Sequence, residues 1–179
     1  MADHPRAPLA SGFTENKMRI SDYISAADVI LDLDAATQQD VLRLLSAEAA
    51  GRLGRPEREV LGALSARERL GSTALGRGVA LPHAQLAGDP SPLALLARLR
   101  RPVDFEARDE EPVDLVILVL WPSASPEGFL PALSGIVGAL RDPQVLRGLR
   151  RARTAGEAAA LLSRDAASPP TGRAEAPEA

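Results

Sequence analysis

The chain contains no cysteine and few aromatic residues, and each shortage narrows the range of possible functions. Without cysteine among its 179 residues, disulfide bonds, thiol catalysis and cysteine-ligated metal sites are excluded. Aromatic residues make up 3 % of the chain and hydrophobic residues 45 %, so the core must be built from leucine, valine, isoleucine and alanine. The lack of cysteine also fits a reducing compartment.

Long apolar segments and an excess of positive charge are missing as well. The most apolar stretch, Val113 to Trp121, contains Asp114 and is far shorter than the about 20 residues of a membrane helix. Residues 1–16 contain no apolar run typical of a signal peptide. The net charge of −3 lacks the basic character of a nucleic-acid-binding protein. We therefore expect a soluble cytoplasmic protein with neither membrane insertion nor a nucleic-acid partner.

The chain length fits one globular domain with loose ends. Residues 1–17 mix prolines, small residues and charges without a period, and residues 164–179 are rich in alanine, proline, serine and glutamate. Neither end can bury enough apolar surface to offset the entropy of ordering. We expect disordered ends at 1–17 and 164–179 around a domain that spans 18–163.

Helical and extended patterns alternate along this domain. The apolar spacing predicts helices at 37–53 with Thr37 as N-cap, from Pro56 to about Gly71, at 126–141, at 143–151 and at 154–163. Strands are predicted at 78–81, 93–99 and 113–121, although the leucines of 93–99 also fit a helix. The last run is apolar enough for a central strand covered on both faces. Alternating elements of this kind indicate a layered α/β domain.

One of the two histidines stands in a context that suggests chemistry. His4 lies in the end expected to be disordered, whereas His83 follows the predicted strand 78–81 and the stiff Pro82. The imidazole would therefore leave the strand at the surface with little freedom of movement. The alternative is an ordinary loop histidine, because spacing alone identifies no partner for it.

The segment before this histidine is rich in glycine and hydroxyl groups. Residues 71–76 match the first positions of a P-loop, but Arg77 and Gly78 stand where the lysine and the hydroxyl residue are required, and a strand follows. Nucleotide binding is therefore disfavoured. Backbone N–H groups of such a loop can still hold a phosphoryl group, and a flexible connector is the alternative.

Charged residues elsewhere offer further candidates. Arg67 ends the second predicted helix, and its planar guanidinium suits a phosphoryl group, although charges at helix ends usually face water. The acidic run 104–114 is interpreted as a solvated loop. A small basic cluster has almost no aromatic residues nearby and is not interpreted as a nucleic-acid site. No carboxylate follows His83 until Asp89, so no metal site is expected. The basic cluster comprises Arg147, Arg150, Arg151 and Arg153.

Taken in order, these motifs resemble a known family. Residues 64–73 followed by 76–83 resemble the signature of the fructose/mannitol-type (EIIA type 2) domains of the bacterial phosphoenolpyruvate-dependent phosphotransferase system. The resemblance includes in particular the nitrogen-regulatory IIA proteins, and it extends from about residue 18 to 162. Supporting segments are 20–24, 31–33, where the family has a turn, 103–105 and the strand 113–120.

The resemblance implies a fold and a reaction. The fold is an α/β sandwich, a mixed β-sheet with helices on both faces. His83 matches the histidine that accepts a phosphoryl group from the phosphocarrier HPr or its nitrogen-branch counterpart. Arg67 matches the active-site arginine that stabilises the phosphoryl charge, and Ser72 and Thr73 match the hydroxyls of the phosphoryl-binding loop. No metal or other cofactor is implied.

One departure from the family bears on the function. Phe129 stands where many members carry a second histidine, and phenylalanine can neither donate a hydrogen bond nor carry charge. This favours a regulatory IIA protein, which controls partners by its phosphorylation state. The alternatives are a sugar-specific IIA subunit that passes the phosphoryl group to a IIB domain, and a non-catalytic binding module. Whether the protein acts as a phosphotransferase component therefore stays open at this point.

Overall fold

The computed structural model describes residues 22–164 of the chain. The disordered ends predicted at 1–17 and 164–179 lie outside the described residues, except that Arg164 is the last residue of helix α5 (Ala155–Arg164). Within the described range no helix is long and apolar enough to cross a membrane.

A mixed β-sheet forms the centre of the domain. Strands β1 and β5 are parallel, β5 and β6 are antiparallel, β3 and β4 both run parallel to β6, and β2 is antiparallel to β3. The order across the sheet is β1-β5-β6-β3-β2, with β4 continuing the line of β3 along the same side of β6. The strands are β1 (Val29–Leu33), β2 (Ala74–Gly76), β3 (Val79–Ala80), β4 (His83–Leu86), β5 (Leu93–Val103) and β6 (Val113–Pro122).

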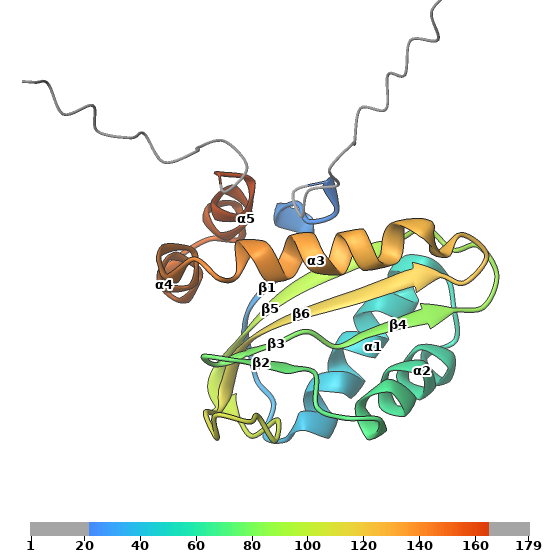
Figure 1. The fold of residues 1–179 in the computed structure, drawn as a ribbon, viewed down its shortest axis with the longest axis horizontal. Helices are drawn as coiled ribbons and strands as arrows, with labels where there is room; N and C mark the ends of the chain where they lie inside the picture. The colour runs from blue at the N-terminus through green and yellow to red at the C-terminus, as the bar shows by residue number, and fades with distance from the viewer. Residues whose placement is uncertain (1–21, 165–179) are drawn as a thin grey trace, which may run out of the picture.

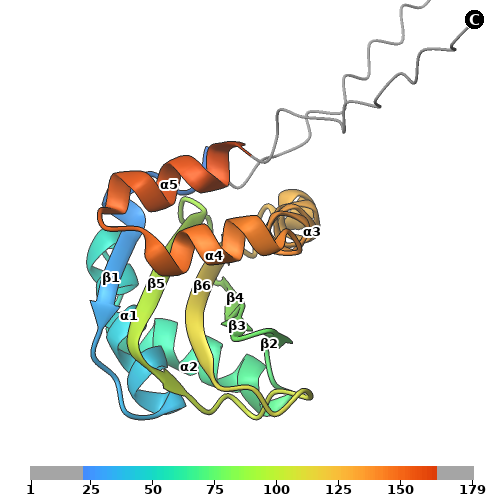
Figure 2. The ribbon, with the colours of Figure 1, turned by 90° about the vertical axis from the view of Figure 1, so that its left-hand side faces the viewer.

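Helices cover both faces of this sheet, as predicted. Helices α1 (Gln38–Leu53) and α2 (Glu57–Arg69) lie on one face, and α3 (Phe129–Ala139), α4 (Pro143–Arg151) and α5 lie on the other (Figures 1 and 2). Two short 3₁₀ turns, η2 (Ala26–Asp28) and η3 (Pro126–Gly128), precede β1 and α3. The predicted fold class is therefore confirmed.

Strand β6 shows why the sheet needs two helical layers. Leu115, Ile117 and Val119 belong to the core beneath α3, α4 and α5. Val116 and Leu118, which alternate with them, belong to the core beneath α1 and α2. Successive side chains of a strand point to opposite faces, so an apolar run without alternation is stable only where both faces are covered.

Helix α1 begins and ends at the residues that the local sequence predicts. Thr37 Oγ1 accepts a hydrogen bond from the backbone N–H of Asp40 at 3.1 Å, and Asp40 accepts in return from the N–H of Thr37. This reciprocal arrangement satisfies two amides that the helix leaves unpaired. Gly54 ends the helix with a φ of 63°, a conformation that glycine adopts without steric cost.

The shortest strands differ from the prediction. Residues 31–33, where the resemblance implied a turn, lie in β1, and part of the expected loop 71–76 forms β2. His83 begins β4 instead of standing at the exit of a strand, and the helix expected at 126–141 starts as a 3₁₀ turn. Strands of two to four residues offer too few positions for an alternating pattern.

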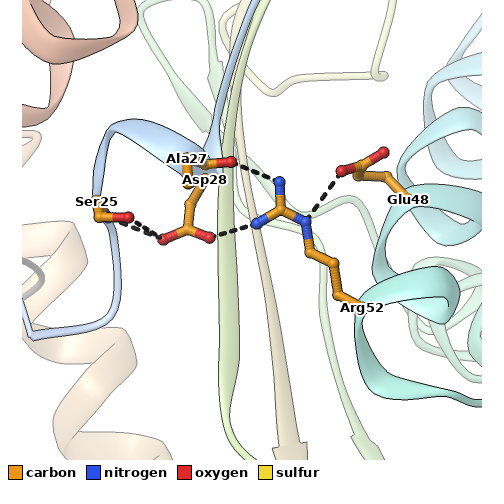
Figure 3. A network of polar contacts seen from close by, with 5 residues as sticks. All are labelled: Ser25, Ala27, Asp28, Glu48 and Arg52. Atoms are coloured by element: carbon orange, nitrogen blue, oxygen red, sulfur yellow. Dashed lines mark hydrogen bonds and ion pairs between the residues drawn. The ribbon is translucent and has the colours of Figure 1, made fainter.

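An arginine of α1 attaches the start of the described chain to the helical layer (Figure 3). The guanidinium of Arg52 donates to the carboxylate of Asp28 and to the carbonyl of Ala27, and its Nε–H donates to Glu48 at 3.0 Å. Asp28 also accepts from the backbone N–H and the hydroxyl of Ser25. These contacts fix the entry of the chain into β1 and have a structural role.

Candidate functional site

His83 occupies a break in the line of strands beside β6. Pro82 separates β3 from β4 and has no N–H to donate, but its carbonyl accepts from the N–H of Val119 at 2.9 Å. The chain therefore stays attached to β6 on both sides of the proline. His83 begins β4 with a half-buried side chain.

Both ring nitrogens of His83 have partners. Nδ1 lies 2.7 Å from the carbonyl oxygen of Leu81, and because a carbonyl only accepts, Nδ1 carries the proton. The Nε–H of Arg67 donates to Nε2 at 3.2 Å. Nε2 therefore has its lone pair available and directed toward a guanidinium, which corresponds to the neutral imidazole protonated on Nδ1.

The surroundings keep this imidazole neutral. Burial is the largest effect and lowers the pKa of His83 below its ordinary value of 6.5. The hydrogen bond to Leu81 raises the pKa, the positive charge of Arg67 lowers it, and the negative charge of Glu68 raises it. Because the net direction is downward, the ring is an uncharged nucleophile at neutral pH.

Arg67 joins the end of α2 to the histidine. Besides its contact with Nε2, its Nη1 donates to the carbonyl of Gly71 at 2.9 Å. The guanidinium is therefore held between the loop after α2 and the imidazole. The structure brings together two of the four predicted site residues, Arg67 and His83.

The two loop hydroxyls, by contrast, are engaged with other acceptors. Thr73 is 4 % exposed, and its hydroxyl donates to Oε2 of Glu68 at 2.7 Å. The hydroxyl of Ser72 donates to the carbonyl of Phe105 and accepts from the N–H of Ala74 at 3.2 Å. Neither hydroxyl contacts His83, so both shape the loop in this state of the protein.

Glu68 is a further residue of the site, and the sequence alone did not point to it. Its carboxylate accepts from the N–H and the hydroxyl of Thr73 and, at 2.7 Å, from Nε2 of Gln38 in α1. A carboxylate in the last turn of a helix is unfavourable next to the helix dipole, and these three hydrogen bonds offset that cost. The sequence signal for Glu68 is its position between Arg67 and Arg69 at the end of a helix, where an acidic residue is unusual.

Phe129 lies beside the histidine, at the start of α3. Its ring centroid is 5.9 Å from that of His83 and 6.1 Å from that of Trp121, and Trp121 in turn stands 5.4 Å from Tyr23. The residue that the resemblance aligned with a second histidine thus contacts the candidate nucleophile with an apolar ring.

The residues described contain no group of three or more histidine or carboxylate side chains that could hold a metal ion.

The P-loop-like segment leads into the β2–β3 hairpin and not into a helix. The turn residues of this hairpin, Arg77 and Gly78, both have positive φ. The acidic stretch 104–114 lies mostly at the surface, with Asp109 accepting from the N–H of Arg77 at 2.8 Å.

The fold and this geometry define a class: a three-layered α/β domain, with helices on both faces of the sheet, that presents one neutral histidine against an arginine. The chain belongs to the family of phosphoenolpyruvate-dependent sugar phosphotransferase system EIIA 2 domains, whose model matches residues 22–165. The family predicted from the sequence is therefore confirmed.

Comparison with individual proteins gives a consistent result. A nitrogen regulatory protein of Bradyrhizobium diazoefficiens is 41 % identical over 138 residues, which cover 77 % of this chain and 90 % of the relative. The crystal structure of nitrogen regulatory protein IIA-Ntr from Neisseria meningitidis has a TM-score of 0.76 and 29 % identity, covering 80 % of this chain and 98 % of that one. IIA mannitol from Escherichia coli, at 23 % identity and a TM-score of 0.64, covers 78 % of this chain and 98 % of that one and shares the fold.

These similarities support the predicted class of function, a regulatory IIA protein of the phosphotransferase system. The roles assigned to His83, Arg67, Ser72 and Thr73 stay predictions.

Proposed function

We propose that this protein accepts a phosphoryl group on Nε2 of His83 and controls partner proteins through its phosphorylation state. The contact between Arg67 and Nε2 carries the proposal, because it places a permanent cation at the nitrogen that would bear the phosphoryl group. Similarity to nitrogen regulatory proteins supports the regulatory part.

Nε2 is the nitrogen that accepts the phosphoryl group, because Nδ1 carries the ring proton. The Nδ1–H donates to the carbonyl of Leu81 at 2.7 Å and keeps that proton throughout. The Nε2 lone pair attacks phosphorus, and the N–P bond forms as the bond between phosphorus and the donor imidazole breaks. The carbonyl of Leu81 stabilises the positive charge that develops on the ring, since hydrogen bonds to charged donors are the stronger ones.

Arg67 has two positions in this scheme. Before transfer its Nε–H covers the Nε2 lone pair, so it must move aside as the donor approaches. Afterwards its planar guanidinium bonds the phosphoryl oxygens, and phosphoryl transfer depends mainly on such positioning and charge stabilisation. Ser72 and Thr73 belong to the same loop, and each would have to exchange its present acceptor to contact a phosphoryl oxygen.

The proposed partners are those that membership of the family implies. The donor is a phosphohistidine carrier of the HPr type, from the sugar or the nitrogen branch, and the recipients of the signal are regulated proteins. A solved complex of mannitol IIA with phosphorylated IIB from Escherichia coli shows that the same fold can contact a IIB domain. The second candidate, transfer to a IIB domain, is disfavoured by Phe129, whose ring offers no hydrogen bond to a departing phosphoryl group.

Incubation with phosphoenolpyruvate, enzyme I and an HPr-type carrier tests the proposal. We expect an acid-labile mass gain of one phosphoryl group in the wild type and none in His83→Ala. A gain that persists in this variant contradicts the site, and no gain in the wild type leaves the non-catalytic binding module. Efficient onward transfer to a IIB domain would favour the sugar-specific subunit.

A further inference from the structure

The fold divides the basic cluster of the sequence into a paired, half-buried member and an exposed part. Arg150 turns toward the sheet, where its Nε and Nη2 bind both carboxylate oxygens of Asp114 at 2.9 Å. The other members, Arg147, Arg151 and Arg153, are exposed, and within residues 22–164 their side chains have no ion pair or hydrogen bond.

Helix stability alone does not explain these exposed cations. A cation in the last turn is favoured by the helix dipole, which accounts for Arg151. Arg147 stands one turn earlier on the same face, and like charges at this spacing destabilise a helix. The unpaired charges concentrate here although the whole chain carries a net charge of −3.

A groove of about 360 Å³ lies next to these arginines, between α4 and α5. Its space arises from small residues, Gly148, Ala152 and Ala160, and Leu161 forms part of its apolar wall. A Cβ placed on Gly148 would lie 2.7 Å from the side chain of Leu161. Only glycine therefore fits at this contact between α4 and α5. Arg151 on one side and Glu157 on the other form its polar edges.

We propose that this groove, with Arg147 and Arg151 beside it, docks an acidic segment of a partner protein. An aliphatic side chain of the partner, such as leucine, occupies the groove, and carboxylates next to it in sequence pair with the two arginines. A nucleic acid fits less well, because it has no aliphatic side chain to place against the apolar wall of the groove.

A partner bound in the groove between α4 and α5 leaves His83 accessible to a phosphocarrier. Phe129 at the start of α3 contacts His83, whereas the end of α3 leads into α4 (Figure 1). At about 1.5 Å per residue, α3 separates the two surfaces by roughly 16 Å. A partner anchored at the groove can therefore stay bound while a carrier reaches His83. The docking itself does not depend on phosphorylation.

Fluorescence anisotropy with the full chain tests this docking site. The probe is a labelled peptide with one leucine among glutamates, and a second peptide has serine in place of leucine. We expect the leucine peptide to bind the wild type, and the double variant Arg147→Glu/Arg151→Glu to weaken it by about tenfold or more. Arg58→Glu controls for a charge reversal on the other side of the sheet, because Arg58 is exposed on α2 and its side chain has no partner among residues 22–164.

A second variant separates the groove from the charges. Ala160→Met, on the exposed part of α5, fills the groove and should remove the preference for leucine over serine while leaving the arginines in place. Circular dichroism confirms that each variant is folded. No binding by the wild type, equal binding of both peptides, equal loss in Arg58→Glu, or equal binding of an oligonucleotide of the same charge would each overturn the inference.

Discussion

At the scale of single residues, the site depends on which atom of each side chain is occupied. The sequence identified His83 as a candidate because it follows a predicted strand and a proline, but it could not predict the tautomer of the imidazole. The carbonyl that fixes Nδ1 belongs to Leu81, two residues earlier, and Pro82 lies between them in the break between β3 and β4. A local backbone contact thus decides which nitrogen is nucleophilic.

Arg67→Ala tests the role of the guanidinium. Without the cation at Nε2 we expect phosphorylation by an HPr-type carrier to slow by about 10²-fold, the usual cost of removing one charge-stabilising donor. Initial rates measured alongside thermal unfolding check this, because the melting temperature should change little. Arg69→Ala is the control: Arg69 lies in the same helix turn, is exposed and has no partner among the described residues. Equal rates for both variants would rule out the proposed role.

The lowered pKa of His83 predicts a pH dependence. Between the folded pKa and 6.5, the unfolded state binds more protons than the folded one, so this group stabilises the protein fully above 6.5. That contribution is lost as pH falls through the folded pKa, and the phosphorylation rate falls around the folded pKa, where the ring of the folded protein protonates. An NMR titration of the imidazole should give a pKa below 6.5 that moves upward in Arg67→Ala. A wild-type pKa at or above 6.5 would contradict the neutral-nucleophile assignment.

At the scale of elements, the loop after α2, residues 70–73, connects helices α1 and α2 to the site around His83. Glu68 ties this loop to its own helix through Thr73 and to α1 through Gln38. The loop in turn presents the carbonyl of Gly71 to the guanidinium of Arg67. Helix ends such as Thr37 and Gly54 were predictable, because their signals lie within a few residues, whereas the connection made by Glu68 joins residues 30 positions apart.

Glu68→Gln should disturb stability and transfer together. An amide accepts at one oxygen only and places its NH₂ against the donors of Thr73, so we expect a loss of about 1–3 kcal/mol in the free energy of unfolding. Phosphorylation should also slow, because the loop no longer orients Arg67. Denaturant unfolding and phosphorylation rates measure the two effects. Glu59→Gln is the control, since Glu59 lies on the same helix as Glu68 but pairs with Arg55, before the helix, and within residues 22–164 has no hydrogen bond or ion pair to the loop. A stability loss with unchanged kinetics would leave Glu68 a structural role alone.

At the scale of the whole molecule, one sheet supports two surfaces. The central strand β6 packs against helices on both faces (Figures 1 and 2). Helix α3 begins with Phe129, which contacts His83, and leads into α4 at its other end. A phosphoryl site at one end of α3 and an acidic-segment groove at the other would let the protein hold a partner and change state at the same time. The Arg147→Glu/Arg151→Glu experiment belongs to this scale, since it tests the second surface without altering the first.

Local signals in the amino-acid sequence are enough to predict the capped helices, the central strand made of an apolar run, and the histidine and arginine that suit phosphoryl chemistry. Which of these residues meet depends on the packing of the whole domain. It brought Arg67 to Nε2 of His83, engaged Thr73 with Glu68, placed Phe129 against the imidazole, and withdrew Arg150 from the basic cluster. The reason is physical: helix caps and apolar periods act over a few residues, whereas these contacts join segments that only the packed sheet holds together.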